Sequence, residues 1–141
     1  MFKKILFLSE TGGFHGGVER FIYQAARTLR KAGIQCSGYF AKMGRNPDIF
    51  ASAFERISFD LNDFRKMADS SDLIWLQKCS DCRVLEDFLG KRPIAVYVHD
   101  HDYYCFRTYK YYPVGRISCH LPCNPLCRIC GSLSRSHGSW Y

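Results

Sequence analysis

The amino-acid sequence predicts an α/β fold with a doubly wound, mostly parallel sheet of the Rossmann-like type. Short apolar runs of strand length alternate with segments in which apolar residues recur every three or four positions, as on helices. A glycine-rich loop separates the first of these runs from the first helical segment. The length of 141 residues, with 47% hydrophobic and 23% charged residues, suits a globular domain with a buried core.

The first strand and the first helix form the opening of a βαβ unit over residues 3–31. Residues 5–8 are an apolar run of the kind expected for a buried strand. The helix that follows carries Glu19 in its first turn and Lys31 in its last, as the helix dipole favours, and Gly33 offers a stop. The apolar stripe of this helix consists of Val18, Phe21, Ile22, Ala25, Ala26, Leu29 and Ala32.

The loop between them has four glycines in six positions: Gly12, Gly13, Gly16 and Gly17. A helix start presents unpaired N–H groups and a partial positive charge, and glycine lets a ligand come close to the backbone. Phosphate is the usual ligand of such a corner. Four glycines exceed what a turn requires, so we expect a ligand to approach here, with a purely structural turn as the alternative.

Two familiar phosphate-binding loops do not fit this segment. A P-loop requires lysine and then serine or threonine after its last glycine, whereas Gly17 is followed by Val18 and Glu19. The dinucleotide fingerprint has a different glycine spacing and needs an acidic residue near the end of the second strand, which here ends in Ala41 and Lys42. A nicotinamide-dependent dehydrogenase is therefore disfavoured.

The later elements continue the alternation. We expect further strands over residues 34–40, 56–59, 72–77 and 94–98, with helices over residues 48–54, after the N-cap residue Asp60, and from residue 80 or 81 to Gly90. In parallel sheets of this kind, ligands bind beyond the carboxyl ends of the strands. The glycine loop and the segment of residues 99–102, His-Asp-His-Asp, both follow strands at that edge.

His99 and Asp100 are the candidate catalytic residues. A histidine directly after a buried strand can donate a hydrogen bond or move a proton near neutral pH. Asp100 or Asp102 could orient its ring or act on a hydroxyl group. The alternatives are a polar turn where the chain leaves the sheet, and a metal site, for which the spacing matches no recognised ligand pattern.

Charge and cysteine content limit the partners and the compartment. A net charge of +7 and a pI near 9.1 suggest an acidic partner: nucleic acid, a phosphorylated sugar donor or an anionic membrane surface. The N-terminal apolar run is too short for a signal peptide, and no run has the length of a membrane span. We therefore expect a cytoplasmic protein whose eight cysteines are thiols or metal ligands rather than disulfides.

Residues 103–141 differ in character from the rest of the chain. Aromatic residues mix with basic ones, a composition that suits a surface for single-stranded nucleic acid, a sugar-binding surface or a flap that covers the core. Cysteines then follow at short spacing, so a structural zinc is one reading and free thiols are the other. The candidate zinc ligands are Cys119, Cys123, Cys127 and Cys130.

Two separated motifs resemble one enzyme family. The run Gly16-Gly17-Val18-Glu19-Arg20, after the first strand, resembles the opening of the N-terminal domain of glycosyltransferase family 4, which has the GT-B fold. The run Val96-Tyr97-Val98-His99-Asp100 resembles that family's strand ending in His-Asp. The continuation HDHDYYC, followed by the four cysteines, resembles a subgroup that carries a cysteine-bearing insertion.

This resemblance implies a retaining transferase that moves a sugar from a nucleotide-sugar to a glycan or lipid-linked acceptor, with no cofactor required for transfer. It implies that His99 contacts the donor sugar, with Asp100 beside it as the second catalytic candidate. The implied contacts to the donor diphosphate and the substrate come from Gly13, His15, Gly16, Gly17 and Glu19. Polysaccharide biosynthesis is the implied setting, with peripheral association at the inner face of the membrane, which a basic surface suits.

The family also has a second domain that binds the nucleotide, and this sequence carries no counterpart of it. On this reading, residues 1–102 are an incomplete acceptor-side domain and residues 103–141 an insertion or tail. A missing C-terminal domain or a partner subunit would complete the enzyme, so we expect no transfer by this chain alone. The alternative is a zinc-stabilised module that binds nucleic acid or protein, whereas the transferase reading predicts no nucleic-acid binding.

Overall fold

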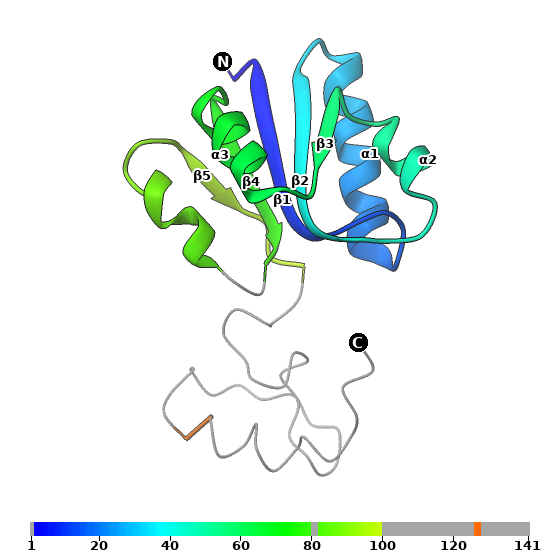
Figure 1. Cartoon of the computed structure of the whole chain (residues 1–141). Helices are drawn as coiled ribbons and strands as arrows, with labels where there is room; N and C mark the ends of the chain where they lie inside the picture. The colour runs from blue at the N-terminus through cyan, green and yellow to red at the C-terminus, as the bar shows by residue number, and fades with distance from the viewer. Residues whose placement is uncertain (1, 80–81, 100–125, 128–141) are drawn as a thin grey trace. The chain divides into compact units, whose positions relative to one another are not determined.

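The computed structural model of the chain describes residues 2–79, 82–99 and 126–127. The chain divides into two compact units, Met1–Tyr97 and Val98–Tyr141. All the strands and helices reported below belong to the first unit. Figure 1 shows this unit as a row of neighbouring strands with helices on either side.

One sheet of parallel strands forms the centre of the first unit (Figure 1). Its strands are β1 (Lys4–Gly12), β2 (Gln35–Met43), β3 (Arg56–Ser58), β4 (Leu73–Lys78) and β5 (Ile94–Val96). They lie in the order β3-β2-β1-β4-β5, and every neighbouring pair is parallel. The predicted α/β fold with a parallel sheet is therefore confirmed.

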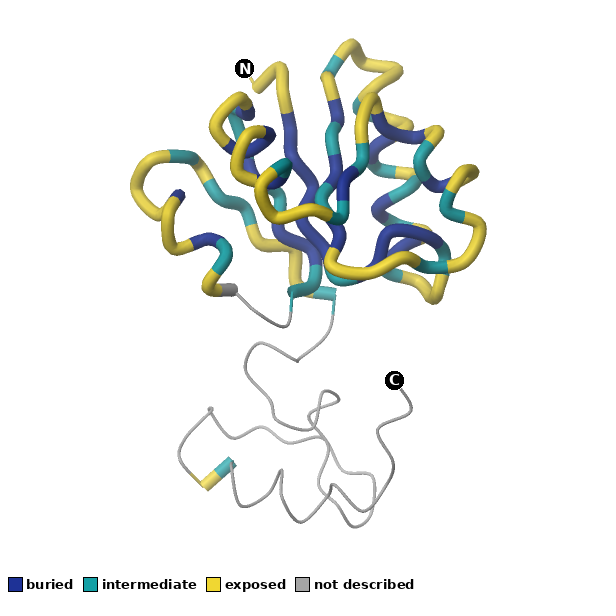
Figure 2. The backbone as a smooth tube through the Cα atoms, in the orientation of Figure 1, coloured by how far each residue is buried: buried dark blue, intermediate teal, exposed yellow. Residues whose placement is uncertain are grey.

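Helices cover both faces of this sheet because side chains alternate along its central strand. Ile5 and Phe7 of β1 pack against α1 (Gly17–Lys31) and α2 (Pro47–Ala51). Leu6 and Leu8 point to the other face, toward α3 (Leu61–Asp69) and the 3-10 helix η1 (Cys82–Phe88). Figure 2 shows the buried positions concentrated along the central strands, with the exposed ones on the outer sides of the helices. The winding is double, as predicted.

The helix ends agree with the sequence signals, and one helix type differs. The carboxylate of Asp60 caps α3 as predicted, with Oδ1 accepting from the N–H groups of Asn62 at 2.7 Å and Asp63 at 3.1 Å. We predicted a helix that ends at Gly90, and residues 82–88 form a 3-10 helix instead of an α-helix. No helix in the described part of the chain has the length and apolar character needed to cross a bilayer.

β2 extends further than its local pattern indicated. We expected this strand over residues 34–40, but it continues to Met43. The reason is its neighbour, since β1 is equally long and pairs with β2 as far as Thr11↔Lys42 and Gly12↔Met43. Hydrogen bonding to a partner strand therefore decides this boundary, and a local pattern does not show it.

Asp72 links the start of β1 to the loop before β4, and this link should make stability depend on pH. Its Oδ2 accepts from the N–H groups of Lys3 at 2.7 Å and Lys4 at 2.9 Å. These two bonds, and then the charges of Lys4 and Arg92, lower the pKa of Asp72 below its ordinary value of 3.8. A pKa lowered by folding means that the unfolded chain binds more protons in acid, so the stabilisation is complete above about pH 5 and is lost as pH falls further.

We therefore expect urea unfolding to show a larger stability for the wild type than for Asp72→Asn at pH 6. The difference should shrink as pH falls below 4, because protonation then removes the acceptor charge in the wild type as well. Unfolding free energies measured at steps from pH 6 to pH 2.5 check this expectation. A difference between the two proteins that stays constant over this range would contradict it.

Candidate functional site

The candidate site lies at the carboxyl edge of the sheet, where β1 stands between β2 and β4. The chain leaves β1 into α1 on one face, and it reaches β4 from α3 on the other face. In open parallel sheets, ligands bind beyond the strand ends at such a reversal. The loop of residues 12–17 begins at the end of β1 and so occupies this position (Figure 1).

The first two glycines of the loop are closely packed, and a Cβ on Gly12 would lie 2.8 Å from the ring of Phe40. The loop after β2 packs directly against them, with the N–H of Gly44 donating to the carbonyl of Gly12 at 3.0 Å. Phe14 and Arg45 then form an antiparallel bridge, with N–H to carbonyl distances of 2.8 and 3.2 Å. Gly13 has a φ of +143°, and a Cβ there would lie 2.6 Å from the carbonyl carbon of Gly44. Only glycine fits at position 13 without a shift of backbone.

The second two glycines have no such explanation. Gly16 and Gly17 are exposed, and the φ of −155° at Gly16 is extended backbone that any residue adopts. A Cβ on Gly16 would come no closer than 3.6 Å to the carboxylate of Glu19, which is ordinary contact. A Cβ on Gly17 would meet nothing within 4 Å. The described fold therefore tolerates side chains at both positions.

Glu19 holds the start of α1 in place. Its carboxylate accepts from the N–H of Gly16 at 2.7 Å, and the residue is only 8% exposed. The first backbone bond of the helix runs from Arg20 to Gly16 at 3.4 Å, so the N–H groups of Gly17 and Val18 precede the helical ladder. Because the N–H of Gly16 already donates to Glu19, the N–H groups of Gly17 and Val18 are the candidates for binding an incoming anion.

Polar side chains flank the loop on its exposed side. His15 is exposed, as a ligand-contacting residue would be, and Arg20 is exposed in the first turn of α1. Arg45 is also exposed, and its bridge with Phe14 brings its backbone to the loop from β2. Sequence reasoning missed Arg45, since no local pattern signals that the loop after β2 pairs with the glycine loop.

The structure gathers part of the predicted site. Gly13, His15, Gly16, Gly17 and Glu19 lie together on one loop and helix start, and their proposed ligand contacts stay predictions. His99 is described and half-buried three residues after β5, within the second unit that begins at Val98.

The structure describes only one of the other candidate site residues. Asp100 lies outside the described residues, as do Cys119, Cys123 and Cys130, and Cys127 is half-buried. Among the described residues, no group of three histidine, cysteine or acidic side chains is placed to hold a metal ion. The zinc prediction therefore stays a prediction.

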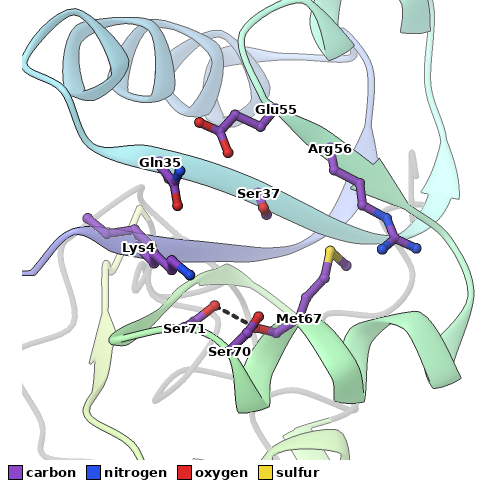
Figure 3. A pocket seen from close by; sticks show the side chains of 9 residues that line it. Lys4, Gln35, Ser37, Glu55, Arg56, Met67, Ser70 and Ser71 are labelled. Atoms are coloured by element: carbon purple, nitrogen blue, oxygen red, sulfur yellow. Dashed lines mark hydrogen bonds between the residues drawn. The ribbon is translucent and has the colours of Figure 1, made fainter.

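A polar cavity of about 260 Å³ lies at the opposite edge of the sheet, where β1, β2 and β3 begin (Figure 3). Its lining includes Lys4, Gln35, Ser37, Glu55, Arg56 and Ser71. Several of its polar groups serve the fold: the hydroxyls of Ser70 and Ser71 donate to the carbonyl of Met67, at 3.0 and 2.6 Å. Arg56 pairs with Asp63 at 2.7 Å. We do not place the site here, because ligands of parallel sheets bind at the other edge.

Comparisons of the chain with protein-family models, with curated proteins and with solved structures found no match. Its fold is that of α/β proteins with a parallel, Rossmann-like sheet. Such folds carry many unrelated activities, so the function has to be argued from the residues at the site.

Proposed function

We propose that this chain is the acceptor-side half of a retaining glycosyltransferase. In this proposal the loop of residues 12–17 receives the diphosphate of a nucleotide-sugar, and the sugar passes to a glycan or lipid-linked acceptor. The observation that carries the proposal is the pair Gly16 and Gly17, which are exposed at the start of a 15-residue helix and for which the fold has no steric need. The resemblance of residues 16–20 and 96–100 to glycosyltransferase family 4 supplies the reaction class.

Glycine at these two positions keeps the approach to the helix start open. Nothing lies within 4 Å of the position that a Cβ on Gly17 would take, so this side of the helix start is open to a ligand oxygen. Donors fixed by a helix need no reorganisation when negative charge grows on the departing diphosphate, so they stabilise the transition state more than the bound substrate. The exposed cation of Arg20 would add to this attraction.

The sugar-side roles in this proposal belong to His99 and Asp100. A neutral histidine can donate one hydrogen bond to a sugar hydroxyl, and a neighbouring carboxylate can fix its tautomer. The pair of carboxylates that glycoside hydrolases require is not needed, because a nucleoside diphosphate is a far better leaving group than a sugar hydroxyl. We expect the nucleotide itself to be bound by a second domain or a partner subunit.

The test of the proposal is a Gly17→Val variant titrated with inorganic pyrophosphate and with UDP-glucose. In the wild type, we expect backbone amide signals of Gly16, Gly17 and Val18 to shift in NMR spectra. The added isopropyl group should weaken binding by about tenfold or more, equivalent to about 1.4 kcal/mol, because it covers the approach to the N–H groups. The fold should be unaffected, since position 17 has open space around it.

Gln24→Val is the matched control, because it adds the same side chain at an exposed position of the same helix, about two turns further on. It should bind both ligands as the wild type does. Equal binding by wild type and Gly17→Val would refute the proposal, and so would ligand-induced shifts confined to the cavity around Lys4 and Arg56.

A further inference from the structure

Tyr97 is joined to α1 by an aromatic contact that the sequence does not reveal. Its ring is stacked on that of Phe21, with centroids 4.5 Å apart and an angle of 24° between the ring planes. The ring of Trp75 in β4 lies edge-on to both rings, at 6.3 Å and 70° to Tyr97 and at 6.2 Å and 86° to Phe21. Contacts from two elements, α1 and β4, therefore fix the orientation of the Tyr97 ring.

This aromatic cluster lies at the same edge of the sheet as the glycine loop. The N–H of Tyr97 donates to the carbonyl of Leu76 at 2.8 Å, which continues the pairing of β4 and β5 one step beyond Val96. Phe21 follows Gly17 by four residues, or about 6 Å along α1. Tyr97 therefore stands beside the first turns of α1, at the end of the pairing between β4 and β5.

Tyr97 is held by its ring contacts with Phe21 and Trp75, and the residue is still partly exposed. Phe21 and Trp75 are half-buried and pack against the core, whereas Tyr97 is 40% exposed. A ring that only sealed the edge of the core would be expected to be mostly covered. A ring that is fixed in advance and still partly exposed loses little conformational entropy when a flat ligand binds to it.

We propose that Tyr97 is a stacking platform for the sugar ring of the ligand whose phosphate groups approach Gly17. This inference rests on the function proposed above and adds a further residue that contacts the sugar. The C–H groups on one face of a pyranose ring form an apolar surface, which packs on an aromatic face as other apolar rings do. Phosphate at the helix start and the hexose on Tyr97 would together fix the orientation of the ligand.

The decisive measurement uses the unmodified chain with glucose, galactose and N-acetylglucosamine 1-phosphates, and inorganic phosphate as the reference. We expect at least one hexose 1-phosphate to bind about fivefold more tightly than phosphate, from the usual strength of aromatic contacts. We also expect nuclear Overhauser effects between the ring protons of Tyr97 and the C–H protons of that sugar. Absence of these effects for every bound hexose 1-phosphate would overturn the proposal.

Two variants distinguish the effect of the aromatic ring from that of an apolar side chain at position 97. Tyr97→Phe keeps the ring and should retain the preference for the sugar phosphate, whereas Tyr97→Leu keeps an apolar side chain and should lose it. Unchanged sugar preference in a folded Tyr97→Leu would overturn the platform. Should that variant unfold, the Overhauser measurement still decides, because it needs no substitution.

The outcomes also distinguish this inference from the proposed function. If phosphate and pyrophosphate shift the amide signals of Gly17 and Val18, but binding of sugars does not depend on Tyr97, only the platform is refuted. If none of the phosphate ligands perturbs Gly17 or Val18, the proposed function fails and the platform fails with it.

Discussion

A Gly13→Ala variant is expected to lose about 3 kcal/mol of its free energy of unfolding, from backbone strain and overpacking together. Alanine pays a conformational cost at the φ of +143° that Gly13 adopts. Its Cβ would also lie 2.6 Å from the carbonyl carbon and 2.8 Å from the Cα of Gly44. Both of these are backbone atoms, so no side-chain rotation can relieve the contact.

Gly17→Ala is the control for this expectation. Urea unfolding of Gly13→Ala, Gly17→Ala and the wild type measures the difference. The same substitution at position 17 meets nothing within 4 Å and lies in the first turn of a helix. It should leave stability unchanged or raise it by up to about 1 kcal/mol, because alanine favours helix more than glycine does. Similar losses in the two variants would show that the loop glycines do not divide into two kinds.

This division explains what the sequence could and could not reveal about the candidate site. The four glycines look alike in the sequence, and their density correctly marked the end of β1 and the start of α1. Their different roles depend on Gly44, which the end of β2 brings against Gly13. A contact of that kind arises from strand pairing and leaves no signal in the local pattern.

The fold was predictable because the apolar residues of the buried helices and strands recur with the spacing of their element over several positions. The stripe on α1 and the apolar runs of β1 and β4 identify helix and strands without knowledge of their partners. Prediction was weaker where pairing with another strand sets the end of an element, since β2 runs to Met43 through its pairing with β1. The helix type of residues 82–88, a 3-10 helix, was not predicted either. Tyr97 appeared only as a strand residue, since its contact with Phe21 joins elements far apart in the chain.

Phe50 carries the second large prediction, because it anchors a helix that is too short to be stable alone. α2 has five residues, and isolated helices of this length do not persist in water. The Phe50 ring is fully buried, and its centroid lies 5.6 Å from that of Phe14 and 5.2 Å from that of Phe40. Tyr23 and Phe54 complete the surrounding aromatic cluster, at 6.3 and 5.4 Å.

Phe50→Ala is therefore expected to lose about 3–5 kcal/mol of unfolding free energy, the usual range for removing a buried phenylalanine ring. Ile49→Ala is the matched control, because Ile49 is 57% exposed on the same helix. This substitution should change stability by less than about 0.5 kcal/mol. Denaturant titrations of the two variants measure the difference. Losses of equal size would mean that burial of the ring does not hold α2 in place.

The Phe50→Ala substitution should also loosen the backbone pairing that holds the glycine loop. Phe14 touches Phe50 through its ring and pairs with Arg45 through its backbone, so the same residue joins the core to the loop. Removing the Phe50 ring leaves the Phe14 ring without one of its supports, and the two backbone bonds of the bridge should then open more often. Hydrogen exchange at the N–H groups of Phe14 and Arg45 should accelerate by more than the loss of global stability alone accounts for. Exchange at these two groups that merely follows global unfolding would instead show that the loop is held by its glycine contacts and not by the aromatic core beneath it.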